Sequence, residues 1–295
     1  LLAWCASIIG PFEIVSGKQR PDGRSSISRL QTSDGHCYLK VHEQLDVWER
    51  EVHGYEQWAP VFGNSAPRLL GVRECDPLAL LIEELPGQVL EKLELSTEQE
   101  GTAWHMAGQM LVRLHDLAGG QYFGPCRRDG SPQGPAISNA VEYVRFELER
   151  EIGKAVDAGY LNNEELAIVT AANQSSHVFA GEQPVACHRD YCPYNWIISG
   201  TGIWRGVIDF EFAHWDVRVA DFSRYPDWEW KERPDLLEAF FEGYGRVLTP
   251  REEEQQLVAY AQYALSAITW GMEASYFGFV EEGRAALKRL AAMTG

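Results

Sequence analysis

Basic residues are scarce in this sequence, and that scarcity excludes some kinds of partner. Lys and Arg together number 26 against 43 Asp and Glu, which gives a formal net charge of −17. A surface that follows nucleic acid or an anionic membrane carries an excess of Lys and Arg. We therefore expect neither partner. The acidity favours a cationic small-molecule substrate, with solubility alone as the alternative explanation.

The sequence also lacks paired cysteines and a long apolar run. Its six cysteines show neither a C-x-x-C pair nor the spacing of a disulfide framework or zinc site, which favours reduced thiols and a cytoplasmic location. The apolar opening at residues 1–9 has no basic residues before it and falls short of the roughly 20 residues that span a bilayer. We interpret it as a packed N-terminal segment.

The composition that remains is that of an ordinary globular protein. Its 295 residues, 45% of them hydrophobic, can bury a large core, and at about 150 residues per domain they predict about two domains. Short strand-like runs fill residues 12–85, with Asp34-Gly35 as a hairpin signal and a helical pattern over 47–58. A buried strand then meets a break at Pro86-Gly87. We place the domain boundary there, which gives domains over 1–85 and 86–295.

The second domain is predicted to be mainly helical, with one interruption. Three strand-like runs lie between residues 184 and 212, and the last two are joined through Gly200-Thr201-Gly202, which predicts a short hairpin. Helical periodicity covers five stretches, at 98–117, 139–158, 163–178, 236–248 and 251–295.

A polar motif lies in the strand-like segment between residues 184 and 212. His188-Arg189-Asp190 through Asn195 has the H-R-D-x-x-x-x-N form, with Asp190 at the start of a loop and Asn195 where the hairpin begins. Asp209 ends the second hairpin strand, so antiparallel pairing returns it beside Asn195. Phosphoryl transfer needs an oxygen to accept or orient the nucleophile's proton, and oxygen ligands for Mg²⁺. We therefore predict Asp190 as the catalytic base, and Asn195 and Asp209 as magnesium ligands.

These anchors, together with Asp209-Phe210-Glu211, resemble those of the aminoglycoside phosphotransferase and choline kinase family, whose fold is similar to that of protein kinases. The resemblance covers most of the chain. It implies an α+β, bilobal protein-kinase-like fold, in which a small antiparallel β-sheet with one helix forms the N-terminal nucleotide-binding lobe. The larger, mainly helical C-terminal lobe carries catalysis and substrate binding.

The resemblance also implies a nucleotide site in the N-terminal lobe, for ATP or GTP with Mg²⁺. Lys40 corresponds to the lysine that holds the α- and β-phosphates, and Glu51 to the glutamate that orients it. The backbone of Glu83 and Leu85 corresponds to the hinge that hydrogen-bonds a purine. Residues 16–26 occupy the place of the phosphate-covering loop, although Gly17 and Gly23 do not form a G-x-G-x-x-G pattern.

Two positions depart from the patterns of related kinases. Aminoglycoside kinases carry His-Gly-Asp where this chain has Arg189, the protein-kinase form, but no A-P-E signature follows Asp209. We interpret Arg189 as a structural residue. Glu211 stands where protein kinases have Gly, and it matches the small-molecule kinases. His188 is expected to orient the loop and Asp221 to brace it. Cys192 is expected to be an inert thiol.

Aromatic and acidic residues of the C-terminal half are candidates for substrate contact, although at helix spacing such residues are more often core aromatics and solvated faces. They are Asp227, Trp228, Glu229, Trp230, Glu232, Glu238, Trp270 and Glu273.

The predicted function is transfer of the γ-phosphate of ATP or GTP to a hydroxyl of a cationic small molecule, with an aminoglycoside or similar antibiotic favoured. A kinase for choline, another amino alcohol or another metabolite uses the same machinery. A kinase-like regulatory protein without turnover is the third hypothesis. It is weaker, because such proteins usually lose one of the residues corresponding to Lys40, Asp190 and Asp209, and this chain keeps all three.

Overall fold

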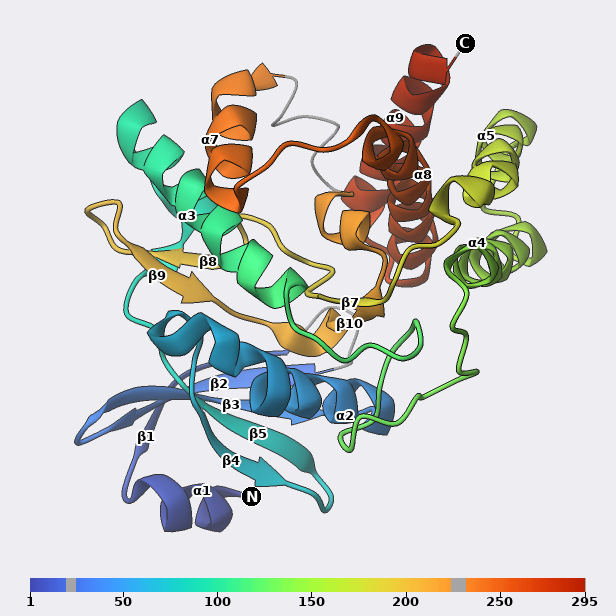
Figure 1. Cartoon of the computed structure of the whole chain (residues 1–295). Helices are drawn as coiled ribbons and strands as arrows, with labels where there is room; N and C mark the ends of the chain where they lie inside the picture. The colour runs from blue at the N-terminus through green and yellow to red at the C-terminus, as the bar shows by residue number, and fades with distance from the viewer. Residues whose placement is uncertain (20–24, 224–231, 295) are drawn as a thin grey trace.

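A five-stranded antiparallel sheet forms one end of the molecule in the computed structural model of the chain, which describes residues 1–19, 25–223 and 232–294 (Figure 1). The strand order is β1-β2-β3-β5-β4. The hairpin signal at Asp34-Gly35 is confirmed, since Thr32 pairs with Gly35 across the turn. The strands are β1 (Glu13–Gln19), β2 (Ser25–Thr32), β3 (Gly35–His42), β4 (Leu69–Arg73) and β5 (Leu78–Glu83).

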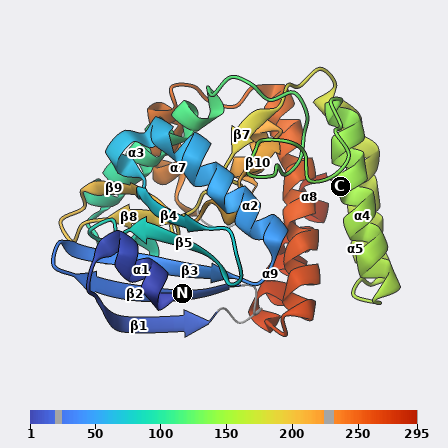
Figure 2. The same cartoon turned by 90° about the horizontal axis from the view of Figure 1, so that it is seen from below.

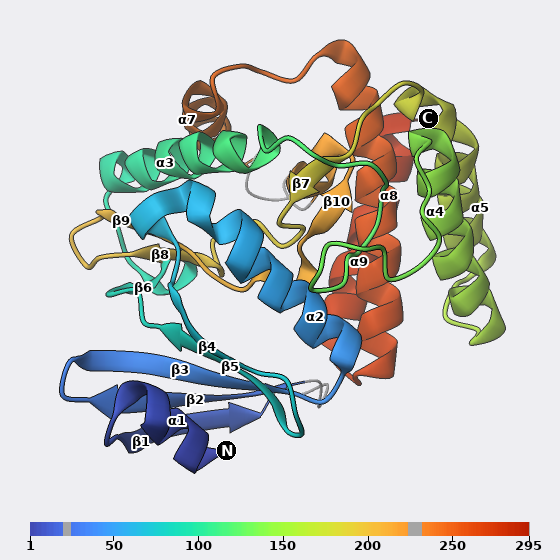
Figure 3. The same ribbon diagram turned by 60° about the horizontal axis from the view of Figure 1, so that its bottom comes forward.

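The two faces of this sheet pack against different helices. Cys37 and Leu39 of β3 are buried in a cluster that includes Cys5 of α1 (Leu2–Ile9). Because side chains alternate along a strand, Lys40 points to the opposite face, where α2 (Leu45–His53) lies. Figure 3 shows α2 lying between the sheet and the rest of the molecule. This part therefore holds two α-helices, and the expectation of one helix is wrong because the packed segment at 1–9 is itself helical.

A π turn follows directly on the last residue of α2. The chain continues through η1 (Gly54–Trp58), the π turn, and η2 (Ala59–Ser65), a 3₁₀ segment, before β4 begins. Such single π turns are rare and are frequently found at functional sites. Gly54 brings the helix close to Phe210, since an added Cβ would lie 2.7 Å from that side chain.

Beyond the first sheet, the chain forms two smaller sheets and a helical layer. The order of the three-stranded sheet is β6-β8-β9, and β7 pairs with β10. These short strands are β6 (Gln88–Val89), β7 (Val185–Cys187), β8 (Trp196–Ile198), β9 (Trp204–Val207) and β10 (His214–Asp216). The chain thus leaves the first sheet at Glu83 and enters the second at Gln88, and the domain boundary placed between them stays a prediction.

Figure 2 shows α4 and α5 side by side along one edge, next to α8. Capping boxes at Ser96, Asn162 and Thr249 start α3, α5 and α8. The helices are α3 (Thr97–His115), α4 (Ala140–Asp157), α5 (Asn163–Gln174), α7 (Pro234–Tyr244), α8 (Pro250–Glu273) and α9 (Phe277–Thr294). The short 3₁₀ segments are η3 (Leu90–Lys92), η4 (Ser175–Phe179), η5 (Phe210–Phe212) and η6 (Arg218–Phe222).

One helix predicted from the sequence is in fact two. The single helix expected over 251–295 is wrong, because the chain turns between Glu273 and Phe277, where Ser275 has a φ of 55°. α8 and α9 pack against each other and enclose a second core with α4 and α5. Among the described helices, none combines the length and the apolar character needed to cross a membrane.

Candidate functional site

The loop after β7 and the β8–β9 hairpin bring Asp190, Asn195 and Asp209 to the same end of the second sheet. Asp190 lies in the loop, Asn195 immediately precedes β8, and Asp209 follows β9. The two hairpin strands are antiparallel, and the N–H of Ile208 donates to the carbonyl of Asn195 at 3.0 Å. The antiparallel return predicted for Asp209 is thus confirmed.

Asn195 and His188 hold Asp190, and the thiol of Cys192 donates to its carboxylate Oδ1 at 3.7 Å. The Nδ2 of Asn195 donates to the Asp190 carbonyl and to its carboxylate Oδ2, both at 2.8 Å. The Nδ1 of His188 accepts from the Asp190 N–H at 3.3 Å, and the opposite ring nitrogen donates to the Ile208 carbonyl at 3.0 Å. The His188 side chain is fully buried. These bonds fit the orienting role expected for His188.

Lys40 lies among three carboxylates. Its Nζ donates to Glu51 Oε1 at 2.8 Å, to Asp209 Oδ1 at 2.8 Å and to Glu211 Oε2 at 2.9 Å. Lys40 and Glu51 are buried, at 3% and 0% exposure. The structure therefore joins the strand lysine and the helix glutamate, as the resemblance implied, and it adds Glu211 as a third partner.

The charges of this cluster do not cancel. Burial opposes ionisation of Glu51, but Lys40 and His42, whose Nε2 lies 2.8 Å from Glu51 Oε2, together hold its pKa below the usual value. One ammonium group thus faces three carboxylates in a site with little water. Carboxylates gathered in this way are stabilised by an additional cation.

Asp209 adopts a backbone conformation that is unusual for a residue with a side chain. Its φ of 69° and ψ of 72° lie in the left-handed region, which costs on the order of 1–3 kcal/mol. Its N–H donates to the hydroxyl of Tyr55, from the π turn, at 3.4 Å. The π turn therefore contributes a side chain that helps to fix the orientation of Asp209.

The donor set at this point suits a magnesium ion. The carboxylates of Glu51, Asp209 and Glu211 have oxygens within 4.8 Å of one another. Within the described residues the amide oxygen of Asn195 accepts no hydrogen bond, because its Nδ2 makes the contacts to Asp190. Mg²⁺ prefers such hard oxygen ligands. The residues present therefore fit Mg²⁺ held by Asn195 and Asp209.

A cavity of about 360 Å³ lies between the first sheet and the β8–β9 hairpin. Lys40, Glu51 and Asp209 line it at one end, and Glu83 and Leu85 line it near Gly87. The structure thus brings together Lys40, Glu51, Glu83 and Leu85, whereas the described residues of the predicted phosphate-covering loop (16–19, 25 and 26) do not line this cavity. Its apolar walls come from Ile27, Ile82, Val89, Ile197 and Ile208.

The contacts of Glu83 limit what it can offer to a purine. Its N–H already donates to the carbonyl of Arg68 at 2.9 Å, and its carboxylate pairs with the Arg68 guanidinium at 2.7 and 3.0 Å. The N–H of Leu85 has no acceptor in the part of the chain that the structure describes. Of the two residues predicted to form a hinge, Leu85 thus has an N–H without an acceptor among the described residues, whereas the N–H of Glu83 is already used.

A second cavity, of about 510 Å³, lies against α4, α8 and the loop of Asp190. Asp190 and Arg189 line it, as do Trp270 and Glu273, two of the candidates for substrate contact. Glu232 and Glu238 do not line it. Outside the described residues lie the candidates Asp227, Trp228, Glu229 and Trp230, and Gly23 of the predicted phosphate-covering loop.

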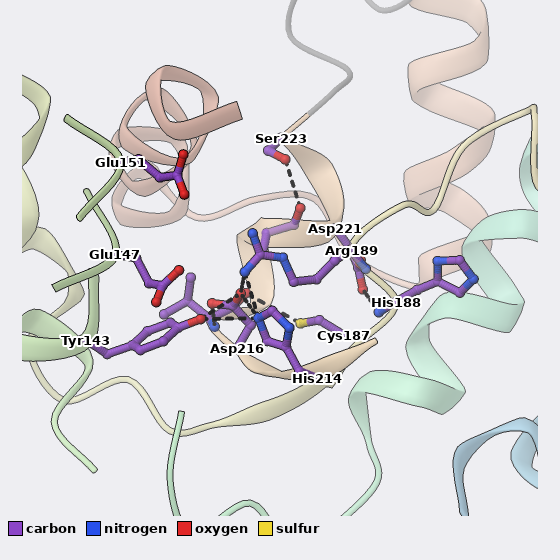
Figure 4. Close-up of polar contacts among 12 residues, drawn as sticks. Tyr143, Glu147, Glu151, Cys187, His188, Arg189, His214, Asp216, Asp221 and Ser223 are labelled. Carbon is purple, nitrogen blue, oxygen red and sulfur yellow. Dashed lines mark hydrogen bonds and ion pairs between the residues drawn. The ribbon is translucent and has the colours of Figure 1, made fainter. Parts of the chain in front are cut away.

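Arg189 is held by a buried polar network (Figure 4). Its Nη1 donates to Asp216 and lies 2.7 Å from Nε2 of His214, while the Tyr143 hydroxyl donates to Asp216 at 3.3 Å. Burial opposes the charge on Arg189, but Asp216 more than offsets this and raises its pKa. Burial, with Arg189 nearby, lowers the pKa of His214 to about 4. Asp216 thus gives Arg189 an internal anionic partner.

The backbone of the same loop is braced by Asp221. Its two carboxylate oxygens accept the N–H groups of His188, at 3.0 Å, and of Arg189. On its other side Asp221 lies 2.9 Å from Nε2 of the buried His115, at the end of α3. Arg189 itself has a φ of 66°, in the region that favours glycine. These contacts fit the bracing role expected for Asp221 and stabilise a strained turn.

Sequence reasoning assigned no catalytic or binding role to Glu211, Tyr55 or Asp216. Glu211 was recognised only as part of the Asp-Phe-Glu motif, and its contact with Lys40 joins positions 171 residues apart. Tyr55 lies one turn beyond Glu51, on a helix that was predicted. The unpaired charge of Arg189 was the one available signal that an acidic partner such as Asp216 had to exist.

Fold and site together define a kinase-like phosphotransferase. The phosphotransferase enzyme family matches residues 16–256, and the chain belongs to this family. A comparison with curated proteins gave no match. The family assignment and the fold predicted from the sequence are both confirmed.

Solved structures show the same fold at low identity. A thermostable mutant of aminoglycoside phosphotransferase APH(4)-Ia, in complex with ADP and hygromycin B, is similar with a TM-score of 0.75 and 13% identity, covering 99% of this chain and 98% of that one. The GDP and kanamycin complex of APH(2")-IIIa has a TM-score of 0.69, 11% identity and coverage of 100% and 99%. Macrolide 2'-phosphotransferase type I has a TM-score of 0.64, 13% identity and coverage of 97% and 95%.

Proposed function

We propose that this protein transfers the γ-phosphoryl group of ATP or GTP to a hydroxyl of a small molecule. The observation that carries the proposal is the position of the polar cluster between two cavities. Lys40 and Asp209 line the cavity that suits a nucleotide, whereas Asp190 lines the other. Asn195 links them, since its side chain bonds Asp190 and its carbonyl accepts the N–H of Ile208, the residue before Asp209.

In the proposed reaction Asp190 acts on the acceptor. Its carboxylate takes the proton of the hydroxyl as the hydroxyl oxygen forms a bond to the γ-phosphorus and the bond to the β–γ bridging oxygen breaks, releasing the nucleoside diphosphate. Lys40, held by Glu51 and Glu211, binds phosphate oxygens of the nucleotide. Mg²⁺ held by Asn195 and Asp209 would neutralise charge on the phosphates. The strained backbone of Asp209 sets its carboxylate in place before the nucleotide binds.

Two lines of support point to different acceptors. The structural relatives include complexes with hygromycin B and kanamycin, which supports an aminoglycoside or similar cationic antibiotic. The lining of the second cavity carries as many basic as acidic side chains, which supports a less cationic acceptor. Choline, another amino alcohol or another metabolite remains the alternative, and the purine preference is open between ATP and GTP.

The proposal is tested by an acceptor panel. The full chain is incubated with ATP or GTP and Mg²⁺ in the presence of aminoglycosides, macrolides, choline, simple sugars and hydroxy acids. Release of nucleoside diphosphate and mass spectrometry of the acceptor are then measured. We expect one class to yield a phosphorylated product. Tight nucleotide binding with no product from any class would instead favour the kinase-like regulatory protein.

A further inference from the structure

Arg50 of α2 has no part in the reaction described so far, yet it lines the cavity of Asp190. Successive side chains on a helix project about 100° apart, so Glu51 lines the first cavity and Arg50 the second. The Nε–H of Arg50 donates to the carbonyl oxygen of Glu211. This bond fixes the guanidinium beside the Asp-Phe-Glu segment and leaves both terminal nitrogens for another partner.

Those terminal nitrogens have no acceptor in residues 1–19, 25–223 and 232–294. Burial lowers the pKa of Arg50 and the nearby Arg189 adds to this effect, while Asp46 and Glu211 attract the guanidinium only from beyond ion-pair distance. An arginine nevertheless stays protonated in a protein. A partly buried cation with two unused donor groups therefore faces the cavity.

The other cations of this cavity differ from Arg50, because each has a carboxylate partner. Arg150 forms a bidentate pair with Glu147 at 3.0 and 2.8 Å. Lys154 donates to Glu273 at 3.0 Å, and Arg189 is held by Asp216. Among the described basic residues that line the cavity, Arg50 is thus the one without a carboxylate partner, and it lies in the same lining as Asp190.

The same pairs make the cavity unsuited to a polycation. Besides Asp190, its acidic lining residues are Glu147, Glu151 and Glu273, and each already has a basic partner. An acceptor with several ammonium groups would have to displace Arg150 and Lys154 from them. An acceptor with one negative group would instead find a vacant donor at Arg50.

The lining of the cavity also includes aromatic side chains. Phe179, Tyr263, Trp270 and Phe279 line it, and the rings of Trp270 and Phe279 pack edge to face at 5.1 Å between centroids. Such walls bind the apolar part of a ligand, while a few placed polar groups fix its orientation.

We propose that Arg50 binds a carboxylate of the acceptor, so that the substrate is a hydroxylated carboxylic acid with an apolar or aromatic part. The two terminal nitrogens form a fork that matches a carboxylate end-on, while the hydroxyl lies at Asp190. This inference rests on the proposed phosphotransferase function and names its acceptor class. Arg50 is then the residue that selects acids over neutral and cationic hydroxyl compounds.

The test compares two probes that differ only in charge. Phenyllactate and phenyllactamide share the ring and the hydroxyl, but only phenyllactate carries a carboxylate. Each is titrated into the full chain and followed by ligand-observed NMR, with kanamycin as the polycationic probe. We expect the wild-type chain to bind phenyllactate about tenfold or more tightly than the amide or kanamycin, the range for a charge-assisted pair.

Variants assign that preference to Arg50. Arg50→Gln is expected to bind the acid and the amide equally, whereas Arg50→Lys keeps part of the preference, because it keeps the charge without the fork. Arg145→Gln, the same change at an exposed position of α4 outside this cavity, is the control and should keep the full preference. Thermal denaturation of each variant identifies any that fails to fold.

Two results would overturn the inference. One is equal behaviour of phenyllactate and phenyllactamide with the wild-type chain, including no binding of either at millimolar concentration. The other is a preference that survives in Arg50→Gln; if Mg·ATP binding is weaker in the same variant, Arg50 would be assigned to the nucleotide phosphates instead. Failure of the proposed function differs from both, because the wild-type chain would then bind no nucleotide or phosphorylate no acceptor.

Discussion

Lys40 bonds three carboxylates, of which Glu51 and Glu211 are buried and Asp209 is partly buried. Lys40→Met would leave Glu51, Asp209 and Glu211 close together without the ammonium group that bonds all three, which should lower the free energy of unfolding by about 3–5 kcal/mol. Chemical denaturation measures the loss. Because the carboxylates can gather around a metal ion, Mg²⁺ should raise the stability of this variant more than that of the wild type.

Lys92→Met is the matched control for this prediction. Lys92 lines the same cavity but is exposed, so its loss should change the stability little, with or without Mg²⁺. Equal stability of Lys40→Met and Lys92→Met would contradict the interpretation of Lys40 as the counter-charge of the cluster.

Asp190 is the residue assigned to the acceptor. Asp190→Ala should lower kcat by about 10²–10⁴-fold, the range for a lost general base. Nucleotide affinity should change little, because Asp190 lines the second cavity and not the first. Steady-state kinetics with the best acceptor and an equilibrium nucleotide titration measure the two effects. Full activity in Asp190→Ala would show that the assigned mechanism is wrong.

At the residue scale, sequence reasoning found the motif but not its partners. Asp190, Asn195 and Asp209 are close in sequence around one hairpin, so their meeting followed from antiparallel pairing. Arg50 and Glu211 come from segments far apart, and their contact depends on how α2 crosses the Asp-Phe-Glu segment. Nothing local in the sequence encodes that crossing. Likewise, the pairing of Glu83 with Arg68 could not be foreseen.

At the scale of elements, α3 and α7 cross at two glycines. A Cβ added at Gly108 would lie 2.0 Å from the Phe240 carbonyl oxygen, and one added at Gly243 would lie 1.9 Å from the His105 carbonyl oxygen. Gly108→Ala should therefore destabilise the protein by about 2 kcal/mol or more, despite the gain of about 1 kcal/mol in helix propensity. Thermal or chemical denaturation measures the change.

Gly153→Ala in α4 is the control for that crossing. An added Cβ at Gly153 meets no atom within 4 Å, so the propensity gain alone should apply and stabilise the protein by about 0.5–1 kcal/mol. Opposite signs for the two substitutions would support close helix packing at Gly108, and a stabilising Gly108→Ala would contradict it.

Elements with clear local signals were predicted, and those without were not. The turn at Asp34-Gly35 and the strand–turn–strand at Gly200-Thr201-Gly202 carry such signals. The break between α8 and α9 was missed, because Ala274-Ser275-Tyr276 contains neither Gly nor Pro and the apolar periodicity continues through it. β10 was missed because three residues are too few for a period to show.

At the scale of the whole molecule, buried histidines should make stability depend on pH. The pKa of His214 falls to about 4 in the fold, and burial also lowers that of His115. Between pH 4 and about 6.5 the unfolded chain therefore binds more protons than the folded one, so stability decreases as pH falls through this range. His214 alone should cost about 3 kcal/mol at pH 4. Melting temperatures across this range measure the effect.

Variants separate the contribution of His214 from a general acid effect. His214→Gln should flatten the decrease between pH 6.5 and 4, whereas His177→Gln, at an exposed position, should not. Below this range the paired carboxylates add to the loss, because the folded pKa values of Glu51 and Asp216 lie below their usual values. An unchanged melting temperature from pH 7 to 4 in the wild type would contradict the assignment.

The central claim is that the cluster between the two cavities transfers a γ-phosphoryl group with Mg²⁺. The measurement that tests it most directly is transfer of the labelled γ-phosphate of ATP or GTP to water or to an acceptor, by the wild-type chain and by Asp209→Ala, with Mg²⁺ present or chelated. The account predicts transfer by the wild type alone, and only with Mg²⁺. Transfer that persists in Asp209→Ala or after chelation, or its absence from the wild type despite nucleotide binding, would contradict it.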